Sequence, residues 1–154
     1  MRNEKALLGK PFFKMIRAVL DTNVFISALF WKGAPHDVFQ LGLRGAFSIL
    51  TSEEILKELQ TKLLYKFELP VENARAFLEI IALNSEAVVP KKKLRVVLED
   101  PADNKIVECA EEGRAQCIVT GDSHLLRLKK YDDIKIVKPA EFLKIISYAK
   151  TGSE

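Results

Sequence analysis

Hydrophobic positions follow two patterns that alternate along the whole chain. Short apolar runs predict buried strands, and longer stretches with apolar residues three and four positions apart predict helices. The predicted strands cover 16–20, 47–50, 117–120 and 134–137, with a further short apolar run at 87–89. The predicted helices cover 24–31, 35–45, 51–65, 101–112 and 123–128, and two more begin at Pro70 and Pro139.

This order of elements predicts the class of the fold. Strands that alternate with helices pair in parallel through right-handed crossovers, and the helices cover both faces of the sheet. We therefore predict a single α/β domain, with a central parallel sheet of four to five strands. Two details are more local. Thr51 and Glu54 fit a capping box that begins the 51–65 helix. The helix after Pro70 carries an apolar stripe of Ala74, Phe77, Leu78, Ile81 and Ala82.

Residues 1–14 fit neither pattern. Met15 directly precedes the first predicted strand, so we assign 15–150 to the domain and 1–14 to a dispensable leader, either disordered or not native. Deletion of the leader is expected to leave the melting transition and the activity unchanged.

Composition limits the class of protein further. The 154 residues are 48% hydrophobic and 29% charged, which is typical of a globular domain with one core. No apolar run approaches the roughly 18 residues that a membrane span requires, which excludes a transmembrane protein. Cys109 and Cys117 match neither a CxxC motif nor zinc-ligand spacing, so we expect buried free thiols and a cytoplasmic location.

Basic residues are only slightly in excess, with a formal net charge of +3, but they gather in two places. A solvated surface explains either cluster alone, whereas both together also suit a polyanionic substrate. The first cluster contains Lys91, Lys92, Lys93 and Arg95, and the second contains Arg127, Lys129 and Lys130.

Acidic residues follow two of the predicted strands. Asp21 comes directly after the first strand, and Asp122 follows the strand at 117–120. Ligands of open parallel sheets bind outside the carboxyl ends of the strands, although a helix N-cap would also explain each aspartate. Asp103 lies on the apolar face of the 101–112 helix, which Asp100 would cap. An ionised carboxylate on such a face needs polar partners or a cation.

The 51–65 helix offers three further carboxylates: Glu53, Glu54 and Glu58. Helical geometry does not choose between them, because Glu53 and Glu58 flank opposite sides of the apolar stripe. Carboxylates that converge without counter-charge repel one another by about 4 kcal/mol per pair at 4 Å. Such a cluster implies cations, and a site built from oxygen ligands suits Mg²⁺ or Mn²⁺.

Four sequence motifs and their order resemble those of the PIN-domain ribonucleases, especially the small prokaryotic members that act as toxins in toxin–antitoxin pairs. The similarity extends from Met15 to Ile146. The motifs are VLDTN (19–23), SEEILKEL (52–59), EDPADNKIVECA (99–110) and VTGD (119–122), and IVKPAEFL (136–143) follows them.

The resemblance implies a site and an activity. It places the family's acidic site on Asp21, Glu58, Asp103 and Asp122, with Asn23 and Thr120 as polar neighbours that orient the acids. One or two Mg²⁺ or Mn²⁺ ions would be bound by Asp21, Asp103 and Asp122, with Glu58 as a further ligand or a water-mediated partner. Relatives often carry another acid at the position of Ala102. The resemblance therefore leaves open whether a second ion is bound.

The implied activity is metal-dependent endonucleolytic cleavage of single-stranded RNA, in a homodimer that a small antitoxin protein blocks. Lys91, Lys92, Lys93, Arg95, Arg127 and Lys129 are then candidates for contacts with the RNA backbone.

Two other classes of protein remain open at this point. A haloacid-dehalogenase-like phosphatase also places an aspartate after its first strand, but its chemistry usually needs a second aspartate where this chain has Asn23. A non-catalytic PIN-like module would have the fold without a working metal site. The exposed or buried state of Phe30 and Trp31, candidates for a core or a partner surface, also stays open.

Overall fold

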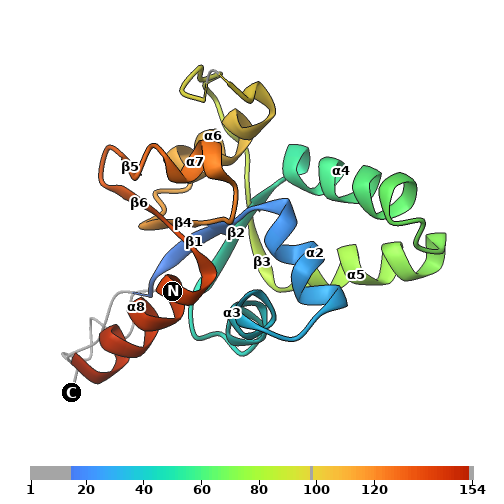
Figure 1. The fold of residues 1–154 in the computed structure, drawn as a ribbon, viewed down its shortest axis with the longest axis horizontal. Coiled ribbons are helices and arrows are strands. Elements are labelled where there is room, and N and C mark those ends of the chain that lie inside the picture. Colours follow the sequence, from blue (N-terminus) through green and yellow to red (C-terminus); the bar gives the residue numbers. More distant parts are fainter. Residues whose placement is uncertain (1–14, 98, 153–154) are drawn as a thin grey trace, which may run out of the picture.

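The structure is a computed structural model that describes residues 15–97 and 99–152. The predicted leader 1–14 lies outside the described residues. A central sheet contains β1 (Arg17–Leu20), β2 (Ser48–Ser52), β3 (Ser85–Val88), β4 (Cys117–Val119), β5 (Lys130–Tyr131) and β6 (Ile134–Val137). The strand order is β3-β2-β1-β4-β6-β5, and every neighbouring pair is parallel except β5 and β6 (Figure 1). The predicted α/β class is confirmed.

Helices cover both faces of this sheet (Figure 1). They are α2 (Thr22–Phe30), α3 (Ala34–Leu43), α4 (Glu53–Thr61) with its π-helical extension η1 (Lys62–Lys66), α5 (Val71–Leu83), the 3₁₀ turn η2 (Pro101–Asp103), α6 (Asn104–Glu112), α7 (Ser123–Leu126) and α8 (Pro139–Gly152). No helix within the described ranges is both long enough and apolar enough to cross a membrane.

Alternate residues of the central strands divide the core into two layers. Ala18 and Leu20 of β1 pack on the layer that includes α2, α3, α5 and α8, whereas Val19 packs on the layer beneath α6 and α7. This alternation is the two-residue period of a strand that is buried on both faces. The central strands are therefore buried on both faces, and we expect ligand-binding residues where the strands end.

Several local predictions need correction. The sheet has six strands rather than four to five, because the two-residue β5 forms an antiparallel hairpin with β6 and is too short to show a periodic pattern. The apolar stripe of α5 is also narrower than predicted: Ala74, Phe77 and Ile81 are buried, but Ala82 is exposed.

The capping prediction was also wrong by one residue. Ser52, not Thr51, caps α4, and its Oγ accepts a hydrogen bond from the backbone N–H of Ile55 at 3.3 Å. Thr51 is held in β2 because it pairs with Ala87 of β3. Tertiary strand pairing has therefore shifted the helix start by one position.

The order of the strands reverses at β1, which is the topological switch point of the sheet. From β1 the chain crosses to β2 on one side, and β4 occupies the other side. Such a switch point leaves a crevice at the carboxyl ends of the two central strands, where open α/β sheets bind their ligands. Asp21 follows β1 and Asp122 follows β4, so both predicted acids belong to this edge.

Candidate active site

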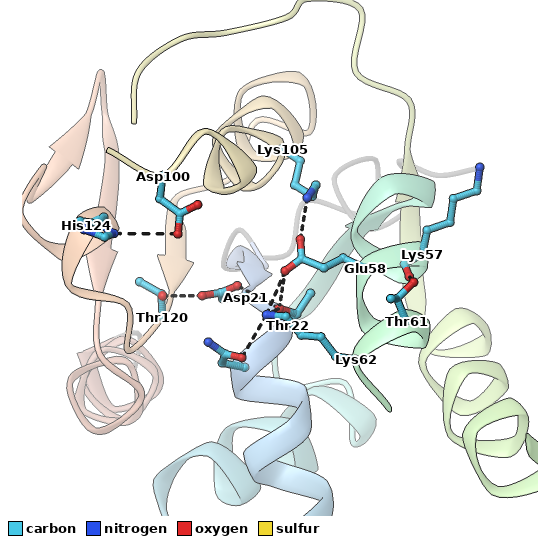
Figure 2. Close-up of polar contacts among 11 residues, drawn as sticks. Asp21, Thr22, Lys57, Glu58, Thr61, Lys62, Asp100, Lys105, Thr120 and His124 are labelled. Carbon is cyan, nitrogen blue, oxygen red and sulfur yellow. Dashed lines mark hydrogen bonds and ion pairs between the residues drawn. The ribbon is translucent and has the colours of Figure 1, made fainter. Parts of the chain in front are cut away.

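Thr120 connects the two acids that follow the central strands. Leu20 pairs with Val119, so Asp21 and Thr120 leave the sheet side by side. The Thr120 hydroxyl donates to Oδ2 of Asp21 at 2.7 Å (Figure 2). It also accepts a hydrogen bond from the backbone N–H of Asp122 at 2.9 Å. Both Asp21 and Thr120 are buried. This threonine therefore fixes one carboxylate directly and the backbone of the other.

Asp21 is a buried acid in a mixed environment. Burial raises its pKa above the ordinary value, and the charge of Glu58 raises it further. The hydrogen bond from Thr120 and the charge of Lys62 act in the opposite direction. Asp21 occupies the N-cap position of α2, but its side chain makes no capping hydrogen bond. The capping explanation for this residue is therefore wrong, and its carboxylate is directed to the site.

Glu58 is the glutamate of α4 that lies at this edge (Figure 2). Its Oε1 is 2.6 Å from the ammonium of Lys105, and its Oε2 is 3.0 Å from that of Lys62. The Thr22 hydroxyl also donates to Oε2, at 3.2 Å. Burial raises the pKa of Glu58, but the two lysines outweigh burial, so its pKa lies below the ordinary value. Glu58 is therefore an ionised carboxylate whose negative charge is balanced by two lysines.

Asn23 lies beside the same group and reaches it through a lysine. Its Oδ1 accepts a hydrogen bond from Lys62 at 3.3 Å, and Lys62 also donates to the Thr22 hydroxyl at 3.2 Å. The connection of Asn23 to the acids therefore runs through Lys62, whereas Thr120 contacts an acid directly.

Asp103 and Asp122 lie close together on the other side of Asp21. Burial and a hydrogen bond with Asp122 raise the pKa of Asp103 to about 8, with smaller contributions from the charges of Asp21, Asp122 and Asp100. Asp122 responds in the opposite sense: burial raises its pKa, but the hydrogen bond with Asp103 and backbone N–H groups lower it below the ordinary value. The pKa values of the two carboxyl groups are therefore shifted in opposite directions, and Asp103 is the one that retains a proton more readily.

A helix-capping role accounts for one of the two carboxylate oxygens of Asp122. Its Oδ2 accepts from the backbone N–H of Leu125 at 3.0 Å and begins α7. Asp103 ends η2 at the N-cap position of α6 and makes no capping hydrogen bond. Its Oδ2 is buried without a hydrogen-bond partner. Asp103 therefore has a free acceptor beside other acids.

The sequence analysis missed four residues that border the site: Lys62, Lys105, Asp100 and His124. Ligand atoms of Asp100, Asp103, Asp122 and His124 all lie within 4.8 Å of one another. Asp100 was interpreted only as a helix cap, and His124 was not assigned at all. The useful signals were the three-residue spacing of Asp100 and Asp103, which eclipses side chains in a 3₁₀ turn, and the position of His124 two residues after Asp122.

The basic residues predicted to bind RNA are exposed. Lys92 lies 3.5 Å from Glu111, and Arg127 lies 3.0 Å from Glu99. Such exposed ion pairs contribute little to stability, so they leave these cations available to another anion. Lys91, Lys93, Arg95 and Lys129 complete the predicted set, and the contact with RNA stays a prediction.

The donor set at this edge fits a divalent metal ion. Asp103 and Asp122 lie together, the charge of Asp21 acts on Asp103, and the buried Oδ2 of Asp103 has no hydrogen-bond partner. Oxygen ligands of this kind are those that Mg²⁺ and Mn²⁺ take in proteins. In their absence burial and the neighbouring acids raise the pKa of Asp103, which favours its protonated form.

Comparison with known proteins places the chain in a family. Residues 17–124 match the model of the PIN domain. The chain is 36% identical to the uncharacterized protein MJ1680 of Methanocaldococcus jannaschii, in an alignment that covers 83% of this chain and 90% of that protein. This chain belongs to the PIN domain family, which indicates a nuclease.

A solved structure shares the fold. The structure of VapBC2 from Rickettsia felis, bound to a DNA fragment from their promoter, matches with a TM-score of 0.58 and 20% sequence identity. The match covers 79% of this chain and 97% of that chain. The PIN assignment thus agrees in sequence and in architecture, and it favours a nuclease over the phosphatase considered above.

Proposed function

We propose that this protein is a Mg²⁺- or Mn²⁺-dependent endoribonuclease that cleaves single-stranded RNA. The observation that carries the proposal is the pairing of Asp103 with Asp122 beside Asp21, whose charge acts on Asp103, while Asp103 keeps a buried oxygen without a hydrogen-bond partner. Divalent ions bound there would activate a water molecule and neutralise the charge that develops on the phosphate. The reaction then needs no side-chain nucleophile.

The residues around the acids have distinct roles in this proposal. Asp21, Asp103 and Asp122 bind metal, and Thr120 holds Asp21 in position through its 2.7 Å hydrogen bond. Glu58 acts through a water molecule, because both of its oxygens are already occupied by Lys62 and Lys105. Asn23 supports Lys62.

The exposed basic residues supply the sequence-independent part of RNA binding. We propose that the RNA backbone is contacted by Lys91, Lys92, Lys93, Arg95, Arg127 and Lys129. Their contribution should weaken steeply with salt, since each neutralised phosphate releases counterions. A tenfold or larger rise in KM between 50 and 200 mM salt is expected for a substrate that contacts several of them.

We further propose that the protein is a cytoplasmic toxin that acts as a homodimer and is blocked by a small antitoxin protein. The sequence motifs support this role, and the fold likeness to VapBC2 agrees with it. Trp31 is 60% exposed and Phe30, beside it, stacks on Phe67 with ring centroids 5.3 Å apart. These aromatic residues are not core, and they offer an apolar surface for a protein partner.

The decisive experiment incubates purified protein with end-labelled single-stranded RNA in Mg²⁺, in Mn²⁺ or with a chelator. Cleavage within the RNA in either metal and none with chelator is expected. Asp21→Asn should reduce cleavage at least a thousandfold and retain the circular dichroism spectrum. Asp133→Asn is the matched control, because Asp133 is exposed in the turn between β5 and β6. Undiminished cleavage by Asp21→Asn, or hydrolysis of a simple phosphomonoester instead of RNA, would contradict the proposal.

A further inference from the structure

His124 faces two carboxylates at a distance that hydrogen bonding does not explain. Its Nδ1 lies 3.9 Å from Oδ2 of Asp100 and 3.9 Å from Oδ2 of Asp122 (Figure 2 shows His124 and Asp100). Both distances are well beyond the roughly 2.7–3.2 Å that is typical of hydrogen bonds between nitrogen and oxygen. The Nδ1 atom is buried and has no hydrogen-bond partner. Both contacts are long ion pairs that require a protonated ring, so a neutral ring has no hydrogen-bond partner at this nitrogen.

Asp103, the fourth residue of this group, also has a buried polar atom without a hydrogen-bond partner. Oδ2 of Asp103 is also buried without a hydrogen-bond partner, and one ligand atom from each of Asp100, Asp103, Asp122 and His124 lies within 4.8 Å of the others. Two unsatisfied atoms of different chemistry, one nitrogen and one oxygen, therefore lie in the same small group. Buried polar atoms are rarely left unpaired, and an ion shared by the group would satisfy both.

The backbone that presents these four side chains is itself well fixed. The side chain of Asn104 accepts hydrogen bonds from the backbone N–H groups of Val96 and Val97 at 2.9 and 2.8 Å, on the segment that approaches Asp100. Asp122 is fixed by its capping bond to Leu125, and His124 lies in the helix that this bond begins. The group is therefore arranged before any ligand binds.

The nature of the donors determines which cation suits them. Mg²⁺ takes oxygen ligands and retains its waters, whereas an imidazole nitrogen suits first-row transition ions. Three carboxylates with one imidazole therefore discriminate against Mg²⁺. This set also differs from the acids of the proposed active site, because it adds Asp100 and His124 and contains neither Asp21 nor Glu58.

We propose that Asp100, Asp103, Asp122 and His124 form an ion position that prefers a first-row transition ion such as Mn²⁺ to Mg²⁺, with His124 as its nitrogen ligand. This inference rests on the proposed function in one respect: Asp103 and Asp122 serve both this position and the acids around Asp21. A nitrogen ligand from His124, which lies outside the acidic motifs, would explain the preference for Mn²⁺.

The test uses the full, tag-free chain and Mn²⁺ as the probe. Electron spin-echo spectroscopy of the bound Mn²⁺ should show coupling to one imidazole nitrogen, and ¹⁵N labelling of histidine should change that signal. Titration calorimetry should show at least tenfold tighter binding of Mn²⁺ than of Mg²⁺. His124→Gln should remove the nitrogen coupling and weaken Mn²⁺ binding at least tenfold, with less than a threefold change for Mg²⁺.

The chain supplies a matched control, because its only other histidine is His36. His36 lies on α3, where its Nδ1 is 3.1 Å from the carbonyl oxygen of Ala28. His36→Gln should keep the nitrogen coupling and both affinities. The spectrum of the wild-type protein needs no variant, so a misfolded His124→Gln would still leave the inference open to refutation. Absence of nitrogen coupling in the wild type, or its persistence in folded His124→Gln, would overturn the inference.

A parallel RNA cleavage assay separates this inference from the proposed function. Metal-dependent cleavage without nitrogen coupling would refute the role of His124 and leave the nuclease proposal intact. Nitrogen coupling with no cleavage in either ion would refute the nuclease proposal and leave the ion position intact.

Discussion

The two sides of the acidic edge solve the same electrostatic problem in different ways. On the side of α4, Glu58 is neutralised by Lys62 and Lys105, and its pKa is lowered. On the side of α7, Asp103 faces only other acids and a histidine without a hydrogen bond, and its pKa is raised to about 8. Lysines stabilise a carboxylate permanently, whereas acids without lysines are stabilised only by protons or metal ions. In the proposed function, a requirement for metal would therefore arise mainly on the α7 side.

The largest expected effect comes from Asp103→Asn, which removes the acid whose pKa is raised to about 8. RNA cleavage should fall at least a thousandfold, because a metal ligand is lost. The metal-free protein should nevertheless become more stable. The folded-state pKa of Asp103 is raised, so the folded protein holds its proton more tightly than the unfolded chain does. Stability of the wild type should therefore fall as pH rises from about 4 to about 8.

Thermal melts of both proteins with chelator, at pH 5 and at pH 8, check this sign. Asp103→Asn should lack this part of the pH dependence, so its advantage in Tm over the wild type should be several degrees at pH 8 and small at pH 5. A variant that is less stable than the wild type at pH 8 would show that the acid is stabilising without metal.

The next largest effect should come from Thr120→Val. In the native protein Thr120 connects Asp21 to the backbone of Asp122. The substitution keeps the shape of a buried side chain but removes the hydroxyl that donates to Asp21 and accepts from Asp122. Loss of a group that orients metal ligands typically reduces metal affinity or activity 10- to 100-fold. Thr120→Ser should recover most of the cleavage rate, because it restores the hydroxyl. Equal activity of the valine and serine variants would remove Thr120 from the mechanism.

Removal of one lysine from the neutralised side should have a smaller effect. Lys105→Met leaves Glu58 with one cation instead of two, so negative charge near the RNA increases. We expect a rise of about tenfold in KM for RNA, since close charges across an interface act on association. Metal affinity at His124 should change less than threefold.

Lys57→Met is the matched control for this experiment. Lys57 lies on the same helix, points away from Glu58 in Figure 2, and pairs with Glu53 at 3.7 Å in solvent. Its substitution should leave KM unchanged. If the two methionine variants behaved alike, the effect would come from net charge rather than from Glu58.

The smallest effect is expected far from this edge, at the start of β1. Arg17 binds both oxygens of Glu86 at 2.8 and 2.9 Å, and the pKa of Glu86 is lowered mainly by that contact. The pair stabilises the fold above the ordinary pKa of Glu86, near 4.5, and loses its contribution as pH falls. Because Glu86 is half exposed, Glu86→Gln should cost about 0.5 kcal/mol or less in a urea melt at pH 7.

Periodic burial made much of the fold predictable. The predicted strand at 134–137 has the observed bounds, and the predicted first strand differs from β1 by one residue. Short apolar runs of this kind are typical of strands buried on both faces of a sheet. The prediction was least accurate where the signal is a contact with another segment. Strand pairing moved the cap from Thr51 to Ser52, and a two-residue hairpin added β5.

The candidate site was predictable in part for the same reason. Asp21 and Asp122 were identifiable from sequence because each directly follows a strand, and strand ends gather at one edge of a parallel sheet. The glutamate of α4 could not be chosen from helical geometry alone, and the choice of Glu58 came from family resemblance. In the structure, Glu58 is the one that contacts Thr22 beside Asp21.

By itself, the sequence determined the order of strands and helices, the position of two acids at the sheet edge and the PIN family. Only the tertiary structure decided which acids are neutralised by lysine and which are left to protons or metal ions. The reason is that periodicity and strand ends are properties of neighbouring residues, whereas Glu58 with Lys105, and Asp100 with His124, are partners separated by 47 and 24 positions in the chain. Charge balance depends on distances in space, and folding alone sets them.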